Sequence, residues 1–383
     1  MSQTRKIPFG RPWITDAEKN AVMEVLSGDV LTHGPQAHAF EKEFAAFIGG
    51  GHCLTTSSGM AALHLAYWQL GIGAGDEVIV AAQTHVATAH AVEIVGAKPV
   101  FADCDLATGN MDPSGIEALI TTRTRAIGIV HYAGIPCDMD AIMAIAERRK
   151  LKVIEDCALA LGTRWRGKHA GLFGDAAIVS FYPVKHITTG DGGMFVTRHA
   201  ELAAKVSKAR AFGVDRTFAE RAIPGVYDVP TLGINYRMSD INSAIGRKQL
   251  ERLNIMLEKR RNNFARLKAA LSKHGNVRVL DVQAPHAENS HYCLTVVLEG
   301  DAGARRDAMV AKLNAAGVGT SVYYPHPVPR LKYYREKYGY NPSQFPNAAR
   351  ISDCAIALPV GPHVGDEDMD YIARNFAQAL KEI

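Results

Sequence analysis

Short apolar runs alternate with amphipathic stretches over the first two thirds of the chain. Five of these runs are rich in β-branched residues and are bounded by Gly, Pro or Asp, which is typical of buried strands. They are EVIVAA at 77–82, KPVFADC at 98–104, RAIGIVHY at 125–132, LKVIEDC at 151–157 and AAIVSFY at 176–182. Helical patterns separate them, for example at 87–96 and 138–150. This alternation predicts an α/β fold, with a mainly parallel sheet between helices on both faces.

The pattern changes near residue 247. A long polar helix is expected there, with its apolar residues on one side: Leu250, Leu253, Met256, Leu257, Phe264, Leu267 and Leu271. An apolar run at 293–300, a helical pattern at 303–316 and a second apolar run at 318–324 follow. We therefore predict a large domain over 1–247 and a smaller C-terminal α+β domain over 248–383.

Composition and charge narrow the class of protein. Of 383 residues, 47% are hydrophobic and 21% are charged, and the formal net charge is only +4, so a nucleic-acid partner is not expected. No apolar run is long enough to cross a membrane, and the first residues lack the apolar core of a signal peptide. The six cysteines are scattered singly, and the histidines lack metal-binding spacing. We expect a soluble cytoplasmic enzyme without a metal site.

In open α/β sheets, ligands bind outside the carboxyl ends of the strands. The polar residues that follow each apolar run are therefore the candidates for chemistry. They are Thr84, His85, Asp103, His131, Tyr132, Asp156 and the segment 180–193. We expect these groups to meet at one edge of the sheet.

Three features of these segments fit together chemically. Lys185 follows a predicted strand and precedes a glycine-rich turn, and Asp156 ends another strand 29 positions earlier. The segment TTSSGMAAL at 55–63 places small residues at a turn that opens a helix, where free N–H groups can bind phosphate. An amine, a carboxylate and a phosphate site together indicate pyridoxal phosphate (PLP), which binds as a lysine Schiff base with an acid at its pyridine nitrogen.

A family resemblance covers essentially the whole chain and keeps its motifs in order. The segments are PFGRPWIT (8–15), LTHGPQAHAFEKEFAAFIG (31–49), SSGMAAL (57–63), GIGAGDEVIV (71–80), GAKPVFADCD (96–105), VIED (153–156), SFYPVKHITTGDGG (180–193) and GINYRMSDINSAIG (233–246). They resemble the DegT/DnrJ/EryC1/StrS sugar aminotransferases. That family consists of PLP fold-type I enzymes of the aspartate aminotransferase superfamily, so residues 1–247 are expected to form the PLP-binding domain.

The resemblance implies roles for the residues around the cofactor ring. Lys185 matches the lysine that forms the Schiff base and then moves the proton between the donor Cα and the cofactor. Asp156 matches the partner of the pyridine nitrogen. His85 occupies the position of an aromatic residue that stacks on the ring.

The resemblance also implies a phosphate site that two subunits share. Ser180 matches a phosphate ligand, as does the backbone around Gly59, Met60 and Ala61. Asn235 matches an asparagine that reaches the phosphate from the other subunit. A homodimer that completes two active sites is therefore expected.

The sequence departs from the family pattern at several positions. Leu159 and Leu161 stand where many members have a Gln–His pair, whose Gln can contact the phenolic oxygen of the cofactor. Met60 replaces a threonine of the phosphate site. His326 lies in a segment that matches a late family motif only loosely. These differences concern the cofactor's surroundings and the substrate, and they leave Lys185 in place.

The function that the resemblance implies is transfer of an amino group from L-glutamate to a nucleotide-linked keto-sugar. A 4-keto-6-deoxy sugar is the first expectation, from its frequency in the family, and polysaccharide, glycan or antibiotic sugars are the typical products.

Two alternatives stay open at this point. One branch of the family has histidine in place of the lysine and removes a sugar 3-hydroxyl, and here Lys185 and His186 are adjacent. Counting from Ser180 and back from Gly190 places Lys185 at the Schiff-base position, which favours the aminotransferase. A catalytically silent homologue is the other alternative.

Overall fold

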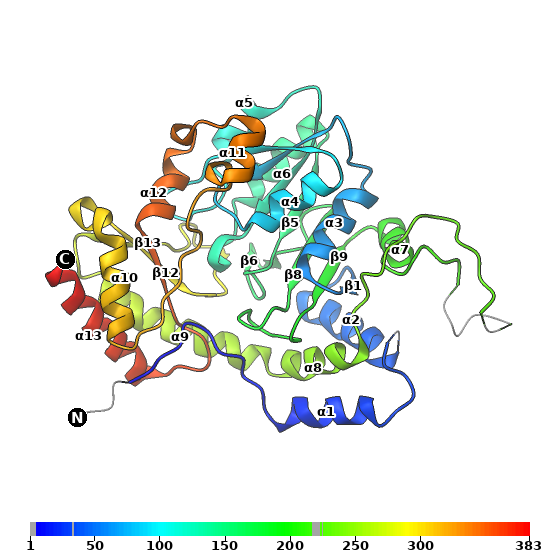
Figure 1. Ribbon diagram of the computed structural model, residues 1–383, viewed down its shortest axis with the longest axis horizontal. Helices are drawn as coiled ribbons and strands as arrows, with labels where there is room; N and C mark the ends of the chain where they lie inside the picture. The colour runs from blue at the N-terminus through cyan, green and yellow to red at the C-terminus, as the bar shows by residue number, and fades with distance from the viewer. Residues whose placement is uncertain (1–4, 33, 217–222, 224) are drawn as a thin grey trace.

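The computed structural model describes residues 5–32, 34–216, 223 and 225–383. Its largest sheet has seven strands in the order β1-β9-β8-β5-β4-β2-β3 (Figure 1). The strands are β1 (His52–Thr56), β2 (Glu77–Ala81), β3 (Lys98–Ala102), β4 (Thr124–Val130), β5 (Lys152–Asp156), β8 (Ala176–Ser180) and β9 (Gly193–Thr197). Strands β8, β5, β4, β2 and β3 run parallel, whereas β9 is antiparallel to both of its neighbours. The predicted α/β fold with a mainly parallel sheet is confirmed.

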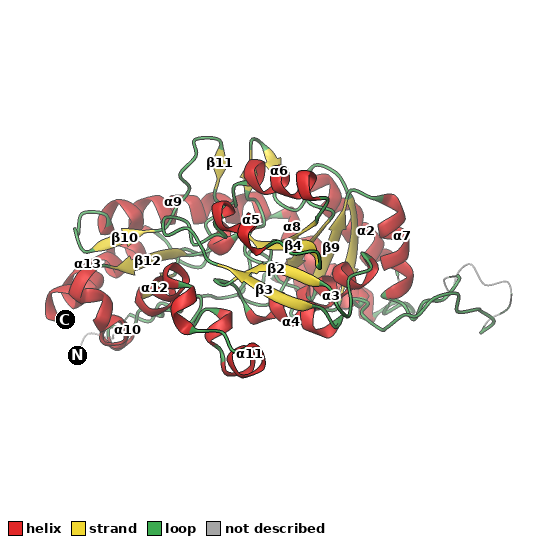
Figure 2. Ribbon diagram, turned by 90° about the horizontal axis from the view of Figure 1, so that it is seen from above, coloured by secondary structure: helices red, strands yellow, loops and turns green. Residues whose placement is uncertain are grey.

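Helices cover both faces of this sheet (Figure 2). They include α2 (Pro35–Ile48), α3 (Gly59–Gln69), α4 (Val86–Ile94), α6 (Met139–Arg149) and α7 (Ala200–Ala209). Strand β2 is buried on both sides because its side chains alternate between the faces. Val78 and Val80 pack in one core with α3, α4 and α7, while Ile79 packs in another with α6. A strand buried on both sides needs a continuous apolar run, which is the pattern that the sequence shows.

The C-terminal third contains a second, three-stranded antiparallel sheet with a core of its own. Its strands are β10 (Val277–Val279), β12 (Leu294–Leu298) and β13 (Ala355–Leu358). The remaining helices are α1 (Asp16–Leu26), α5 (Ile116–Leu119), α8 (Asp240–Glu251), α9 (Leu253–Leu271), α10 (Arg306–Ala315), α11 (Lys332–Tyr338), α12 (Pro346–Cys354) and α13 (Asp366–Glu382). Side chains of α9, α10 and α13 pack against this sheet. The predicted domain boundary at 247/248 falls inside α8 and stays a prediction.

Some predicted elements have different limits in the structure. The expected long helix is divided into α8 and α9 at Arg252, whose φ and ψ are −105° and 3°. The apolar run at 318–324 forms only isolated bridges, from Val318 to Ile7 and from Ser321 to Ala357. A small sheet of β6 (Arg164–Trp165), β7 (Lys168–His169) and β11 (Ala287–Glu288) completes the strands. Within the described residues, no helix is long and apolar enough to cross a membrane.

Candidate active site

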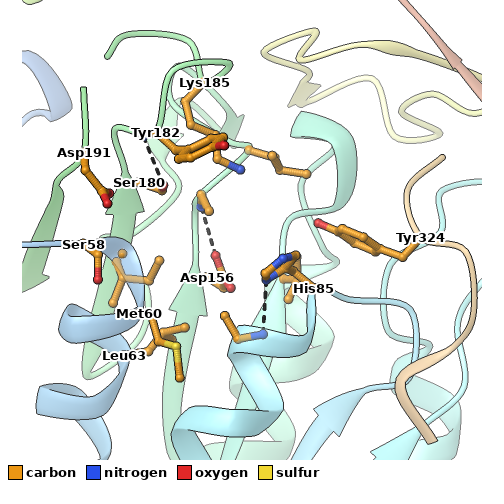
Figure 3. Close-up of a pocket in the computed structure, with 16 residues that line it drawn as sticks. Ser58, Met60, Leu63, His85, Asp156, Ser180, Tyr182, Lys185, Asp191 and Tyr324 are labelled. Carbon is orange, nitrogen blue, oxygen red and sulfur yellow. Dashed lines mark hydrogen bonds between the residues drawn. The ribbon is translucent and has the colours of Figure 1, made fainter. Parts of the chain in front are cut away.

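A cavity of about 280 Å³ opens at the carboxyl ends of the central strands. Val130, Asp156 and Ser180 line it, and each is the last residue of its strand, β4, β5 or β8. The N-terminal part of α3, the start of α4, the loops after β5 and β8, and Tyr324 form most of the remaining wall (Figure 3). The position agrees with the general rule for ligand sites in open α/β sheets.

Lys185 belongs to the loop that follows β8, and its side chain lines this cavity. Its Nζ lies 5.5 Å from the centre of the Tyr292 ring, and that aromatic face attracts the charged form of the amine. Burial disfavours the charged form more strongly and lowers the pKa of Lys185 to about 8, although the charge of Asp156 acts in the opposite direction. About a tenth of this amine is therefore neutral, and nucleophilic, at pH 7.

Asp156 ends β5, and its carboxylate is buried at the base of the cavity. Its Oδ1 accepts a hydrogen bond of 3.0 Å from the Ala158 N–H (Figure 3). Its Oδ2 accepts a hydrogen bond of 2.8 Å from the Thr88 hydroxyl on α4. The carboxylate is thus held in one orientation by two separate segments while it still faces the space beside Lys185.

The N-terminus of α3 forms a site for an anion. Ser58 is the N-cap residue, and its hydroxyl accepts the Ala61 N–H at 3.1 Å. Gly59 and Met60 begin the helix and line the cavity, so their N–H groups lie at the positive end of the helix dipole. A Cβ on Gly59 would lie only 3.0 Å from the Ser180 Cβ, so the close approach of these two segments favours glycine. Ser180 adds a hydroxyl to the same wall.

His85 is the N-cap residue of α4 and also lines the cavity. Its Nδ1 accepts the Ala87 N–H at 3.2 Å, and its ring lies at 63° to the Tyr324 ring with centroids 5.6 Å apart. Burial lowers the pKa of His85, which keeps the imidazole neutral. A neutral ring with an occupied Nδ1 can offer a flat face and an Nε2–H to the cavity.

These groups fit PLP. The α3 N-terminus and the Ser180 hydroxyl suit a phosphate, the Lys185 amine suits an aldehyde, and the Asp156 carboxylate suits a protonated pyridine nitrogen. The fit rests on these four kinds of group, which all border the same cavity. A ligand of this kind needs a phosphate end and a nitrogen-bearing ring together.

Of the strand-end candidates, Thr84, Asp103, His131 and Tyr132 do not line this cavity. Two of the residues expected to bind the cofactor, Ala61 and Asn235, do not line it either. The Ala61 N–H already donates to the Ser58 hydroxyl. Asn235 is exposed and pairs through its backbone with Ala211. Because Asn235 is expected to act in the site of a partner subunit, that role stays a prediction.

The structure also adds cavity residues to which the sequence analysis gives no role. Tyr182 is 54% exposed at the mouth, and Asp191 comes from the glycine-rich turn. Both lie within motifs that the sequence identifies, so their proximity to Lys185 could have suggested them. Tyr324 lies 139 positions after Lys185 (324 − 185), and no local pattern connects the two residues.

His186 occupies a different environment from its neighbour Lys185. It is buried outside the cavity lining, and its Nε2 lies 3.1 Å from the carbonyl oxygen of Ser290. Burial holds the pKa of His186 well below its usual range. The chain therefore presents the lysine, and not the histidine, to the cavity.

His131 is buried beneath the sheet edge and is part of the core. Its Nδ1 accepts the Cys137 N–H at 3.1 Å, so the proton of the neutral ring is on Nε2, which lies 3.1 Å from the Glu155 carboxylate. Glu155 also accepts N–H groups from residues 171, 173 and 174. The hydrogen-bonding groups of His131 and Glu155 are thus satisfied within the protein, which does not favour a metal site there.

Known proteins resemble this chain over nearly its whole length. The model of the DegT/DnrJ/EryC1/StrS aminotransferase family matches residues 12–377. The spore coat polysaccharide biosynthesis protein SpsC of Bacillus subtilis is 38% identical over 382 residues, which cover 98% of this chain and 97% of SpsC.

Solved structures show the same likeness in three dimensions. The putative sugar aminotransferase Spr1654 from Streptococcus pneumoniae in its PMP form has a TM-score of 0.94 at 28% identity, covering 98% of this chain and all of that one. Helicobacter pylori PseC, an aminotransferase involved in the biosynthesis of pseudoaminic acid, has a TM-score of 0.93 at 26% identity, covering 99% of this chain and all of that one. A PLP form of Spr1654 is also similar, with a TM-score of 0.92.

Proposed function

The chain belongs to the DegT/DnrJ/EryC1/StrS aminotransferase family, and we propose that it transfers the amino group of L-glutamate to a nucleotide-linked keto-sugar. It is a PLP-dependent aminotransferase with the fold of the type I PLP enzymes. One observation carries the proposal: Lys185, Asp156 and the α3 N-terminus border the same cavity.

Bound PLP supplies an aldehyde for the amine and a ring that accepts the electron pair left when the donor Cα loses its proton. Lys185 has two tasks around this chemistry. Its neutral amine would hold the cofactor through the aldehyde, and the same amine, when free, would take the proton from the donor Cα. A pKa of about 8 suits both tasks, because the free amine is then partly neutral and still basic enough to hold the proton.

Asp156 has an electrostatic task. Its carboxylate keeps the proton on the pyridine nitrogen, because a negative group at hydrogen-bond distance favours the protonated form of a ring nitrogen. The Gly59 and Met60 N–H groups, with the Ser180 hydroxyl, would hold the phosphate. These two sets of contacts would hold the cofactor and leave its aldehyde accessible to Lys185.

The proposed acceptor rests on the relatives. SpsC is named for the biosynthesis of a spore coat polysaccharide, and Spr1654 is described as a putative sugar aminotransferase. Both names concern sugar chemistry, and the family resemblance makes a 4-keto-6-deoxy sugar the first acceptor to test. Lys185 lines the cavity, whereas the neighbouring His186 is buried against the Ser290 carbonyl outside it. This difference supports amino transfer over hydroxyl removal.

We also propose that the enzyme acts as a homodimer. Residues 225–234, which lead into Asn235, project from the body of the chain (Figures 1 and 2). Several of their apolar side chains are at least half exposed, which is typical of an interface. They are Val226, Tyr227, Val229 and Leu232, the last being 74% exposed. A second copy would cover them and would bring Asn235 to a neighbouring cavity.

The direct test is a product assay. The purified enzyme with PLP and L-glutamate is incubated with a panel of nucleotide-linked keto-sugars, and amino-sugars are identified by mass spectrometry. We expect an amino-sugar and an equal amount of 2-oxoglutarate with at least one acceptor, and none with Lys185→Ala. The absence of an amino-sugar across the panel would contradict the proposal, and loss of a sugar hydroxyl without gain of nitrogen would support the dehydratase alternative.

A further inference from the structure

Thr88 is a buried polar residue behind the cavity. It lies in the first turn of α4 and is 1% exposed, and it does not belong to the cavity lining. Its hydroxyl is 2.8 Å from Asp156 Oδ2 and 2.9 Å from the hydroxyl of Thr84, which is equally buried. Thr88 therefore reaches the cavity only through Asp156.

The directions of these two hydrogen bonds follow from the groups themselves. A carboxylate can only accept, so the Thr88 hydroxyl must donate its single proton to Asp156. The Thr88 oxygen can then only accept from Thr84, which makes Thr84 the donor. The result is a one-way chain from Thr84 through Thr88 to Asp156 Oδ2, and charge-assisted bonds of this kind are stronger than neutral ones.

Local helix formation does not explain this threonine. Threonine is a weaker helix former than alanine, and in a helix its hydroxyl commonly bonds a backbone carbonyl one turn earlier. Here the hydroxyl instead bonds a side chain 68 positions away in the sequence. Its β-branched side chain has few rotamers, so it can hold the carboxylate in one orientation.

We propose that Thr88 is a positioning residue for Asp156, an inference that rests on the role proposed for Asp156 above. The Ala158 N–H fixes one carboxylate oxygen from the loop after β5, and Thr88 fixes the other from α4. With both oxygens held, the carboxylate meets the ring nitrogen without first losing rotational freedom. Thr84 contributes by holding the Thr88 hydroxyl in its donating direction.

The experiment compares two cofactors that differ only at the ring nitrogen. Cofactor-free protein is titrated with PLP and with its carbocyclic analogue, in which CH replaces the pyridine nitrogen, and the dissociation constants are measured by absorbance. We expect Thr88→Val to raise the dissociation constant of PLP about tenfold, or ~1.4 kcal/mol, and that of the analogue less than twofold. Thr88→Ser, which keeps the hydroxyl, should stay within about twofold of the wild type for both ligands.

Two further variants separate the possible outcomes. Asp156→Asn tests the premise, and it should weaken PLP far more than the analogue. If it weakens both equally, the role of Asp156 and that of Thr88 both fail. If Asp156→Asn discriminates but Thr88→Val weakens both ligands equally, or leaves PLP binding unchanged, the Thr88 proposal alone is overturned. Thr84→Val, expected to weaken PLP about threefold without affecting the analogue, decides the matter if Thr88→Val does not fold.

Discussion

At the scale of the residue, the site depends on environments that change ordinary side chains. Lys185 is one of many lysines in the chain, but burial near Tyr292 lowers its pKa to about 8. Asp156 is held at both oxygens, and Gly59 stands where a larger residue would meet Ser180. The chemistry therefore comes from position as much as from residue type.

The lowered pKa of Lys185 predicts how cofactor attachment depends on pH. Below pH 8 most of the amine is protonated, and only the neutral fraction can attack an aldehyde, so the rate should rise about tenfold per pH unit in that range and level off above it. A lysine with the ordinary pKa of 10.5 would continue to gain rate to that value. Stopped-flow absorbance on cofactor-free protein measures the rate, with Lys185→Arg as the unreactive control. A rate still rising above pH 9.5 would contradict the assignment.

At the scale of the element, the N-terminus of helix α4 places two side chains at the site. Its N-cap residue is His85 and its first turn carries Thr88, so one helix start supplies a ring at the cavity wall and a donor to Asp156. The helix α3 has the corresponding role for an anion through Ser58 and Gly59. The N-termini of two helices, α3 and α4, therefore border the cavity.

Two substitutions at His85 separate its two contributions. His85→Phe keeps an aromatic face but loses the acceptor for the Ala87 N–H, so it should lower the stability of the cofactor-free protein by ~1 kcal/mol and change PLP affinity little. His85→Asn keeps a capping oxygen but loses the ring, so it should preserve stability and weaken PLP by ~1 kcal/mol. Thermal unfolding and PLP titration measure the two effects. If both variants lose the same property, the assignment of one of the roles is wrong.

The sequence predicts the central strands of the large sheet better than it predicts the edge strand β1 or the break between α8 and α9. Strands with long apolar runs, such as β2 and β4, are identifiable because burial on both faces demands apolar residues. Strand β1 reads HCLTT, which is short and partly polar, and its antiparallel pairing with β9 is a long-range contact. The break at Arg252, whose guanidinium donates to the Trp13 carbonyl of a distant segment, is also invisible to periodicity.

At the scale of the whole molecule, the cavity combines segments that are far apart in the chain. Lys185 and Asp156 could be predicted because they follow strands of one sheet, and strand ends of a parallel sheet meet at one edge. Tyr324 could not, because its position depends on how the C-terminal third packs back onto the sheet. The surroundings of Asn235 could not be predicted from local sequence either, since its proposed role depends on a second copy of the chain.

Mixing two inactive variants tests the shared site. If Asn235 acts in the partner's cavity, a mixed dimer of Asn235→Ala and Lys185→Ala subunits contains one intact site and one doubly altered site. Random reassociation should then restore about a quarter of wild-type activity. Activity no greater than the sum of the two separate variants would contradict a site completed across the dimer. Sedimentation of each variant checks that it still associates.

The central claim is that Lys185 holds the cofactor and that L-glutamate then displaces it. Its most direct test is the visible absorption spectrum of the PLP-loaded protein, recorded before and after addition of L-glutamate, beside Lys185→Ala. We predict that the wild type is yellow, that L-glutamate bleaches the band, and that the variant lacks this band and its response. A wild-type spectrum that ignores L-glutamate, or a Lys185→Ala variant that behaves as the wild type does, would contradict the account.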